Sequence, residues 1–131
     1  MNPLEKMAHS IHGESLKPGG SARAFNSETV AVAVLEDSTG ERQTVAASSR
    51  GRMSRAQAAR AAMLGISPLN MPNVSGPGGH AEVNIINRYA EANNMRVVDI
   101  AASRPICCSC NEEINRHGAN AASPIKQKSK R

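Results

Sequence analysis

The sequence predicts an α/β sandwich in which helices pack against a mixed β-sheet. A run rich in β-branched residues at 29–36 and a second run at 41–47 flank turn-forming residues at 37–40, which predicts a β-hairpin. A helix, a strand and another helix are predicted after the hairpin, and this order is typical of the α/β class. Because 131 residues suffice for one hydrophobic core, we expect residues 1–131 to form a single domain.

The first part of the chain, residues 1–27, is predicted to form one short helix followed by a loop. The segment Pro18-Gly19-Gly20 breaks the helical pattern. Four apolar residues share one face of this helix: Leu4, Met7, Ala8 and Ile11.

The middle of the chain alternates between helix and loop patterns. Ser54 is the expected N-cap of a helix over 55–64, and Gly65 is its expected end. Three prolines and three glycines predict a loop over 66–79. A second helix is predicted over 80–94.

The last third of the chain is expected to complete the sheet. Residues 95–101 are almost continuously apolar at their centre, which is typical of a covered parallel strand. A helix over 108–117 and an edge strand over 123–126 should follow. The residues 126–131 are predicted to be a disordered basic tail.

The composition favours a polyanionic partner and excludes a membrane span. The formal net charge is +5, and the four charges of the tail account for all but +1 of it. A second basic cluster lies in mid-chain, at Arg50, Arg52, Arg55 and Arg60. No apolar run approaches the roughly 18 residues of a transmembrane helix, and the N-terminus lacks the apolar centre of a signal peptide.

The three cysteines all lie within Cys107-Cys108-Ser109-Cys110. A disulfide framework would distribute them along the chain, so this cluster indicates metal binding or redox chemistry in a reducing compartment. Cys107 and Cys110, at i and i+3 in the first turn of a helix, can converge on one ion. His80, at the start of the preceding helix, can supply a third ligand.

One histidine and two cysteines form a ligand set that zinc accepts, and three protein ligands leave the fourth position for water, as in catalytic sites. Zinc lowers the pKa of such a water from its high value in bulk water to about 7. Glu82 lies two residues after His80, where a carboxylate can move protons between the water and a substrate. We therefore predict one catalytic Zn²⁺ held by His80, Cys107 and Cys110, with Glu82 as the catalytic residue.

The motif His80-Ala81-Glu82, followed by Pro105-Ile106-Cys107-Cys108-Ser109-Cys110, resembles the signature of zinc nucleobase deaminases, H-x-E and then P-C-x-x-C. The stretch 79–115 is similar in particular to deaminase domains at the C-terminal ends of bacterial polymorphic toxins. This resemblance covers about the C-terminal third of the chain. It implies a three-layer cytidine-deaminase-like sandwich with helices on both faces of the sheet, and hydrolytic deamination of cytosine to uracil in nucleic acid.

Ile106 separates Pro105 from the first cysteine, whereas the general signature places proline directly before it. This spacer leaves open whether Cys107 or Cys108 is the first ligand. The two-residue gap between Cys107 and Cys110 favours Cys107, since it lets both sulfurs reach one ion. Cys108 is then a small apolar filler or a bystander at the start of the helix.

The resemblance also implies a pocket for the base near the zinc site. Substrate contacts are expected from residues at strand ends and loops beside the motif: Ser48, Ser49, Arg50, Ala81, Ser103 and Arg104. Phe25 is the candidate for stacking on a base, because Tyr89 is expected to pack against the sheet. His9, His12 and His117 are expected to be exposed surface residues.

A toxin of this kind is implied to be secreted or delivered as part of a larger protein and to act in the cytoplasm of a target cell. Its partners would be nucleic acid, with single- or double-stranded DNA favoured over RNA, and a cognate immunity protein; no membrane is expected. Three alternatives stay open: a deaminase of free nucleosides or nucleotides, an adenine deaminase acting on nucleic acid, and a zinc-binding domain without enzymatic activity.

Overall fold

The computed structural model describes residues 2–14, 28–49, 53–69 and 81–125, and these residues form an α/β fold with one mixed sheet of five strands. The predicted α/β class is confirmed. The strand order is β3-β2-β1-β4-β5, so β1 occupies the centre of the sheet.

The predicted hairpin is formed by β1 (Val30–Glu36) and β2 (Arg42–Ser48), which pair antiparallel from Val30 opposite Ser48 to Glu36 opposite Arg42. In the turn between them, Asp37 Oδ1 accepts hydrogen bonds from the backbone N–H groups of Thr39 and Glu41 at 2.9 and 3.0 Å. Both strands lie within one residue of their predicted ranges, because β-branched runs and a local turn are short-range signals.

Strand β4 (Arg96–Ala102) pairs antiparallel with β1, with Ala31 opposite Ala102. The expectation of a parallel strand is therefore only partly correct, because β4 is parallel to its other neighbour, β5 (Asn120–Ala121). This pairing places the start of β1 and the ends of β2 and β4 at the same end of the sheet. The connection from β4 to Cys107 leaves the sheet at that end.

Both outer strands differ from the predictions. The predicted loop over 66–79 contains β3 (Ser67–Pro68), a two-residue strand parallel to β2. The predicted edge strand over 123–126 is wrong for the described residues to 125, because β5 lies earlier, at Asn120–Ala121. Ile125 makes only an isolated bridge with Ile106. The hydroxyl of Ser123 accepts a hydrogen bond from Ala102 N at 2.9 Å instead.

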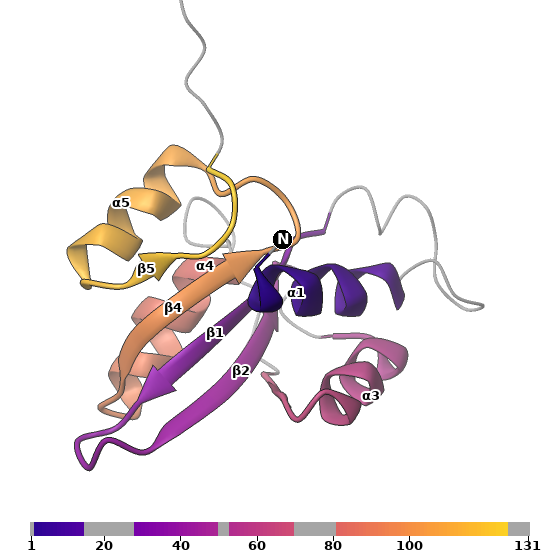
Figure 1. The fold of residues 1–131 in the computed structure, drawn as a ribbon, viewed down its shortest axis with the longest axis horizontal. Helices are drawn as coiled ribbons and strands as arrows, with labels where there is room; N and C mark the ends of the chain where they lie inside the picture. Colours follow the sequence, from indigo (N-terminus) through magenta and orange to yellow (C-terminus); the bar gives the residue numbers. More distant parts are fainter. Residues whose placement is uncertain (1, 15–27, 50–52, 70–80, 126–131) are drawn as a thin grey trace, which may run out of the picture.

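Helices cover both faces of the sheet, which gives three layers (Figure 1). Helices α1 (Pro3–Gly13) and α3 (Arg55–Met63) lie on one face. The core beneath them consists of Ala8, Ile11, Val30, Val32, Ala46, Met53, Ala61 and Ile66.

The opposite face carries α4 (Ala81–Val83), which continues as the π-helix η2 (Asn84–Ala90), and α5 (Cys108–Arg116). Tyr89 packs against this core, as predicted. The buried residues on this face alternate along the strands with those of the first face, and they include Ala31, Ala33, Leu35, Val45, Ala47, Ile85, Ile86, Ile100, Ile106, Cys110 and Ile114.

Three local expectations about the helices have clear outcomes. Ser54 caps α3 as predicted, and a reciprocal capping box with Gln57 satisfies two backbone N–H groups. The helix predicted over 80–94 is present in the described residues, with an α-helical start at Ala81–Val83 and π-helical geometry over Asn84–Ala90. His12, expected at the surface, is only 4% exposed, because it lies on the buried side of α1 with Ala8 and Ile11. His9 and His117 are exposed as expected.

Candidate functional site

The candidate site lies where two neighbouring helices begin on the same face of the sheet. Helix α4 begins at Ala81 and carries Glu82, while α5 begins at Cys108 and carries Cys110 in its first turn. The two helices pack against each other, and Ala81 and Cys110 belong to the same buried core. The packing of these helices brings together residues that are far apart in the sequence.

Cys107 is the N-cap of α5, and its extended backbone (φ −70°, ψ 160°) turns the side chain back over the first turn of the helix. Its sulfur accepts a hydrogen bond from Cys110 N at 3.4 Å and lies 3.3 Å from the hydroxyl of Ser109. Burial raises the pKa of the Cys107 thiol, but the hydrogen bonds from Ser109 and Cys110 outweigh burial and lower that pKa below its usual value. Ser109 was not among the expected site residues, although a hydroxyl in the first turn of a helix is a local signal for such a contact.

Cys110 is completely buried, and its sulfur lies 3.0 Å from the sulfur of Cys107. The two cysteines do not form a disulfide with each other. Burial and the charge of Glu82 raise the pKa of the Cys110 thiol strongly, and hydrogen bonds with Cys107 and Glu82 raise it further. The buried thiol is thus the neutral hydrogen-bond partner of a carboxylate.

Glu82 is 3% exposed, which is unusual for a carboxylate. It precedes the buried residues Ile85 and Ile86 by three and four positions, so it lies on the side of the helix that faces the core. The structure therefore brings Glu82, Cys107 and Cys110 together, and these are three of the four residues in the predicted catalytic centre.

The sulfurs of Cys107 and Cys110 are donors that fit a zinc ion. Two sulfurs on one tetrahedral zinc, each about 2.3 Å from the metal, lie roughly 3.8 Å apart. The observed separation is 3.0 Å, roughly 0.8 Å shorter than this value. His80 lies outside the described residues, and within the described ranges no group of three or more metal-binding side chains is found.

Cys108 is half-buried and belongs to the first turn of α5, next to the paired sulfurs. The contact between sulfurs is made by Cys107 and Cys110, the pair that the two-residue gap favours.

The serines expected to contact the substrate lie at the same end of the sheet, but their hydroxyls form hydrogen bonds within the protein. Ser103 is 7% exposed, and its Oγ accepts a hydrogen bond from Val30 N at 3.0 Å. The Oγ of Ser49 accepts one from Thr29 N at 2.9 Å. These two serines join the ends of β4 and β2 to the start of β1.

Ser48 was expected to face the same pocket, and the structure corrects this orientation. It is completely buried, and its hydroxyl donates to Glu28 Oε2 at 2.5 Å. The other oxygen of Glu28 accepts a hydrogen bond from Gln57 Nε2 on α3 at 2.8 Å. Ser48 therefore lies on the face covered by α1 and α3, opposite the cysteines.

Glu28 was not anticipated, although it is a completely buried carboxylate beside three strand ends. Its sequence context, a glutamate before a β-strand, resembles that of an exposed residue, so no local signal marks it. Among the remaining expected contacts, Ala81 is buried in the core and Arg104 is exposed. Arg50 and Phe25 lie outside the described residues.

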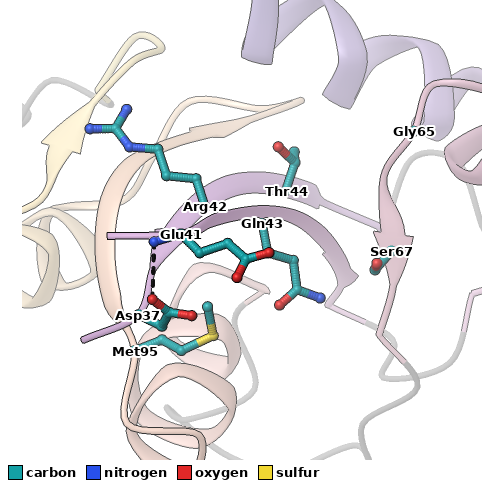
Figure 2. A pocket seen from close by; sticks show the side chains of 8 residues that line it. All are labelled: Asp37, Glu41, Arg42, Gln43, Thr44, Gly65, Ser67 and Met95. Carbon is teal, nitrogen blue, oxygen red and sulfur yellow. Dashed lines mark hydrogen bonds between the residues drawn. The ribbon is translucent and has the colours of Figure 1, made fainter. Parts of the chain in front are cut away.

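A separate hollow of about 590 Å³ lies at the opposite end of the sheet, beside the hairpin turn (Figure 2). Its described lining contains none of the expected site residues. The lining consists of Asp37, Glu41, Arg42, Gln43, Thr44, Gly65, Ser67 and Met95. Several of these polar groups already bond within the hairpin, as the contact between Asp37 and Glu41 shows.

Comparison with known proteins finds no match to any protein-family model, curated protein or solved structure. In the part of the chain that the structure describes, no helix combines the length and the apolar character that crossing a membrane requires.

Proposed function

We propose that this protein is a zinc-dependent deaminase that hydrolyses cytosine to uracil in nucleic acid. The observation that carries the proposal is the convergence of Glu82 with the Cys107–Cys110 pair from two different helices. The H-x-E and C-x-x-C motifs are each common by chance. The contact of Glu82 with the cysteine pair supports the proposal, because a hydrolytic metal centre requires an acid–base group beside its metal ligands.

The residues proposed to hold zinc are His80, Cys107 and Cys110. When bound, zinc would supply a Lewis acid that makes water nucleophilic at neutral pH. Glu82 takes the proton from the attacking water and passes it to N3 of cytosine as the new C–O bond forms at C4. The same carboxylate then takes the proton of the new C4 hydroxyl and delivers it to the C4 amino group, which leaves as ammonia while a carbonyl remains at C4.

The burial of Glu82 suits this role. A carboxylate that is 3% exposed is shielded from bulk water, so it exchanges protons with groups inside the site. A positioned acid–base group of this kind contributes about 10²- to 10⁴-fold in rate.

Nucleic acid is the proposed substrate because the chain carries a net charge of +5 and resembles toxin deaminases. Arg55 on α3 is exposed, and Arg104 is exposed at the end of the sheet where the cysteines lie. We further propose that the protein is delivered as part of a larger toxin, acts in the cytoplasm of the target cell, and is neutralised by an immunity protein. An acidic immunity protein would complement this basic chain.

The proposal is tested with zinc-loaded protein and three substrates: a cytosine-containing single-stranded oligonucleotide, the same sequence as a duplex, and free cytidine. Mass spectrometry of the nucleosides would measure uracil formation. We expect uracil in an oligonucleotide and little uridine from cytidine. Uridine from cytidine alone would favour the free-nucleoside alternative, inosine from adenine would favour the adenine alternative, and no product from any substrate would contradict the proposal.

A further inference from the structure

The Cys107 and Cys110 sulfurs are close enough to react with each other. Their separation of 3.0 Å is about 1 Å longer than a disulfide bond of about 2.0 Å. Cys107 precedes the helix in an extended conformation and Cys110 lies in its first turn, so rotation about the side-chain bonds can close this gap.

The two thiols differ in their access to solvent. Cys107 is half-buried, whereas Cys110 is completely buried. An external oxidant can therefore reach the sulfur of Cys107 first. Cys110 is then the nearest group that can react with the modified sulfur, because it already contacts it.

We propose that Cys107 and Cys110 are a reversible oxidation site, and that their disulfide excludes zinc from the centre. The disulfide rests on the geometry of the sulfurs alone. Its effect on zinc and on activity rests on the proposed function, since the same two sulfurs are the proposed ligands.

The oxidant that we name is a low-molecular-weight disulfide such as oxidised glutathione. The Cys107 sulfur attacks one sulfur of the oxidant, a mixed disulfide forms, and the first glutathione leaves as a thiol. The Cys110 sulfur then attacks the Cys107 sulfur and displaces the second glutathione. Two protein thiols are oxidised, one disulfide is reduced to two thiols, and the two protons lost by the protein are recovered in the glutathione thiols.

Such a pair would respond to the compartment that surrounds the protein. Disulfides persist in oxidising environments and are reduced in the cytosol. A delivered enzyme would thus carry an oxidised, metal-free centre outside cells and recover both thiols after entry into a target cell.

The test uses the full chain without added metal, exposed to oxidised glutathione, with thiol titration and intact mass as readouts. Cys108→Ser keeps the proposed pair, and Cys110→Ser is the matched variant that breaks it. We expect the wild-type chain and Cys108→Ser each to lose two thiols and about 2 Da, reversibly with dithiothreitol. Cys110→Ser should accumulate a mixed disulfide with glutathione.

The inference is overturned if Cys108→Ser retains both of its thiols. It is also overturned if Cys110→Ser loses two thiols as fast as the wild-type chain, because that result would identify Cys107 and Cys108 as the reacting pair. Far-UV circular dichroism establishes that each variant is folded. In a second arm, saturating zinc should slow the loss of thiols. If the disulfide forms but zinc gives no protection, the proposed metal site fails while the inference about the sulfurs stands.

Discussion

The carboxylate of Glu82 and the thiol of Cys110 are hydrogen-bonded inside the protein, although they belong to different helices. A carboxylate is rare in a buried core without a partner. Their contact joins the start of α4 to the first turn of α5, and it places an acid–base group beside a candidate metal ligand.

Loss of a proposed ligand should remove zinc. We expect His80→Ala and Cys110→Ser to lose bound zinc, while Cys108→Ser keeps one ion per chain, as measured by elemental analysis of folded protein. Zinc at about 100 times its Kd should raise the free energy of unfolding by about 2.7 kcal/mol in the Cys108→Ser protein and leave the other two unchanged. A full zinc complement in either ligand variant would refute the assignment.

Glu28 should matter for stability. Glu28→Ala leaves the Ser48 hydroxyl and the Gln57 amide without their buried acceptor, so the free energy of unfolding should fall by about 1–3 kcal/mol. Urea denaturation measures this change. The matched control is Glu112→Ala on the exposed face of α5, which should change the free energy of unfolding by less than about 0.5 kcal/mol. Equal effects of the two substitutions would show that the hydrogen bonds of Glu28 do not stabilise the fold.

Ser103 should act on stability rather than on substrate affinity. Removing its hydroxyl in Ser103→Ala leaves the buried Val30 N–H without an acceptor, which should cost about 1–3 kcal/mol. We expect KM for an oligonucleotide to be unchanged in this variant and to rise in Arg104→Ala. A rise in KM without a loss of stability in Ser103→Ala would instead support a direct substrate contact.

The ion pairs of Glu36 should make stability depend on pH. Hydrogen bonds from Arg96 and then Arg42, at 2.8 and 3.0 Å, lower the pKa of Glu36 below its ordinary value of 4.5. The stabilisation is therefore complete above about pH 4.5 and is lost as the pH falls through the lower folded-state pKa.

Urea denaturation of the wild-type protein and Glu36→Gln, at pH values above and below about 4.5, tests the direction of this pH dependence. The difference in unfolding free energy should shrink as the pH falls, and it should also shrink at high salt because Glu36 is accessible to solvent. A difference that grows towards acid pH would contradict this explanation.

Features set by neighbouring residues could be predicted from the sequence. The hairpin follows from two β-branched runs around a turn, and the start of α3 follows from Ser54 and Gln57, which satisfy each other across one helical turn. The contact between Cys107 and Cys110 is equally local, because an N-cap and the residue three positions later face each other.

Features set by distant parts of the chain could not be predicted. The orientation of Ser48 depends on the register of β2, since each step along a strand reverses the face. The burial of Glu28 depends on its contact with α3, and the two-residue strand β3 is too short to leave a pattern. Over the few turns that follow Glu82, the spacing of apolar residues does not distinguish a π-helix from an α-helix.

The most direct test of the proposed catalytic centre compares wild-type protein with Glu82→Gln, each loaded with zinc, on a cytosine-containing oligonucleotide. Both proteins should bind one zinc ion, and uracil formation should fall at least about 100-fold in the variant, since only the proton carrier is lost. Equal rates of uracil formation in the two proteins would contradict the role of Glu82, and a zinc-loaded wild-type protein that forms no uracil would contradict the proposed reaction.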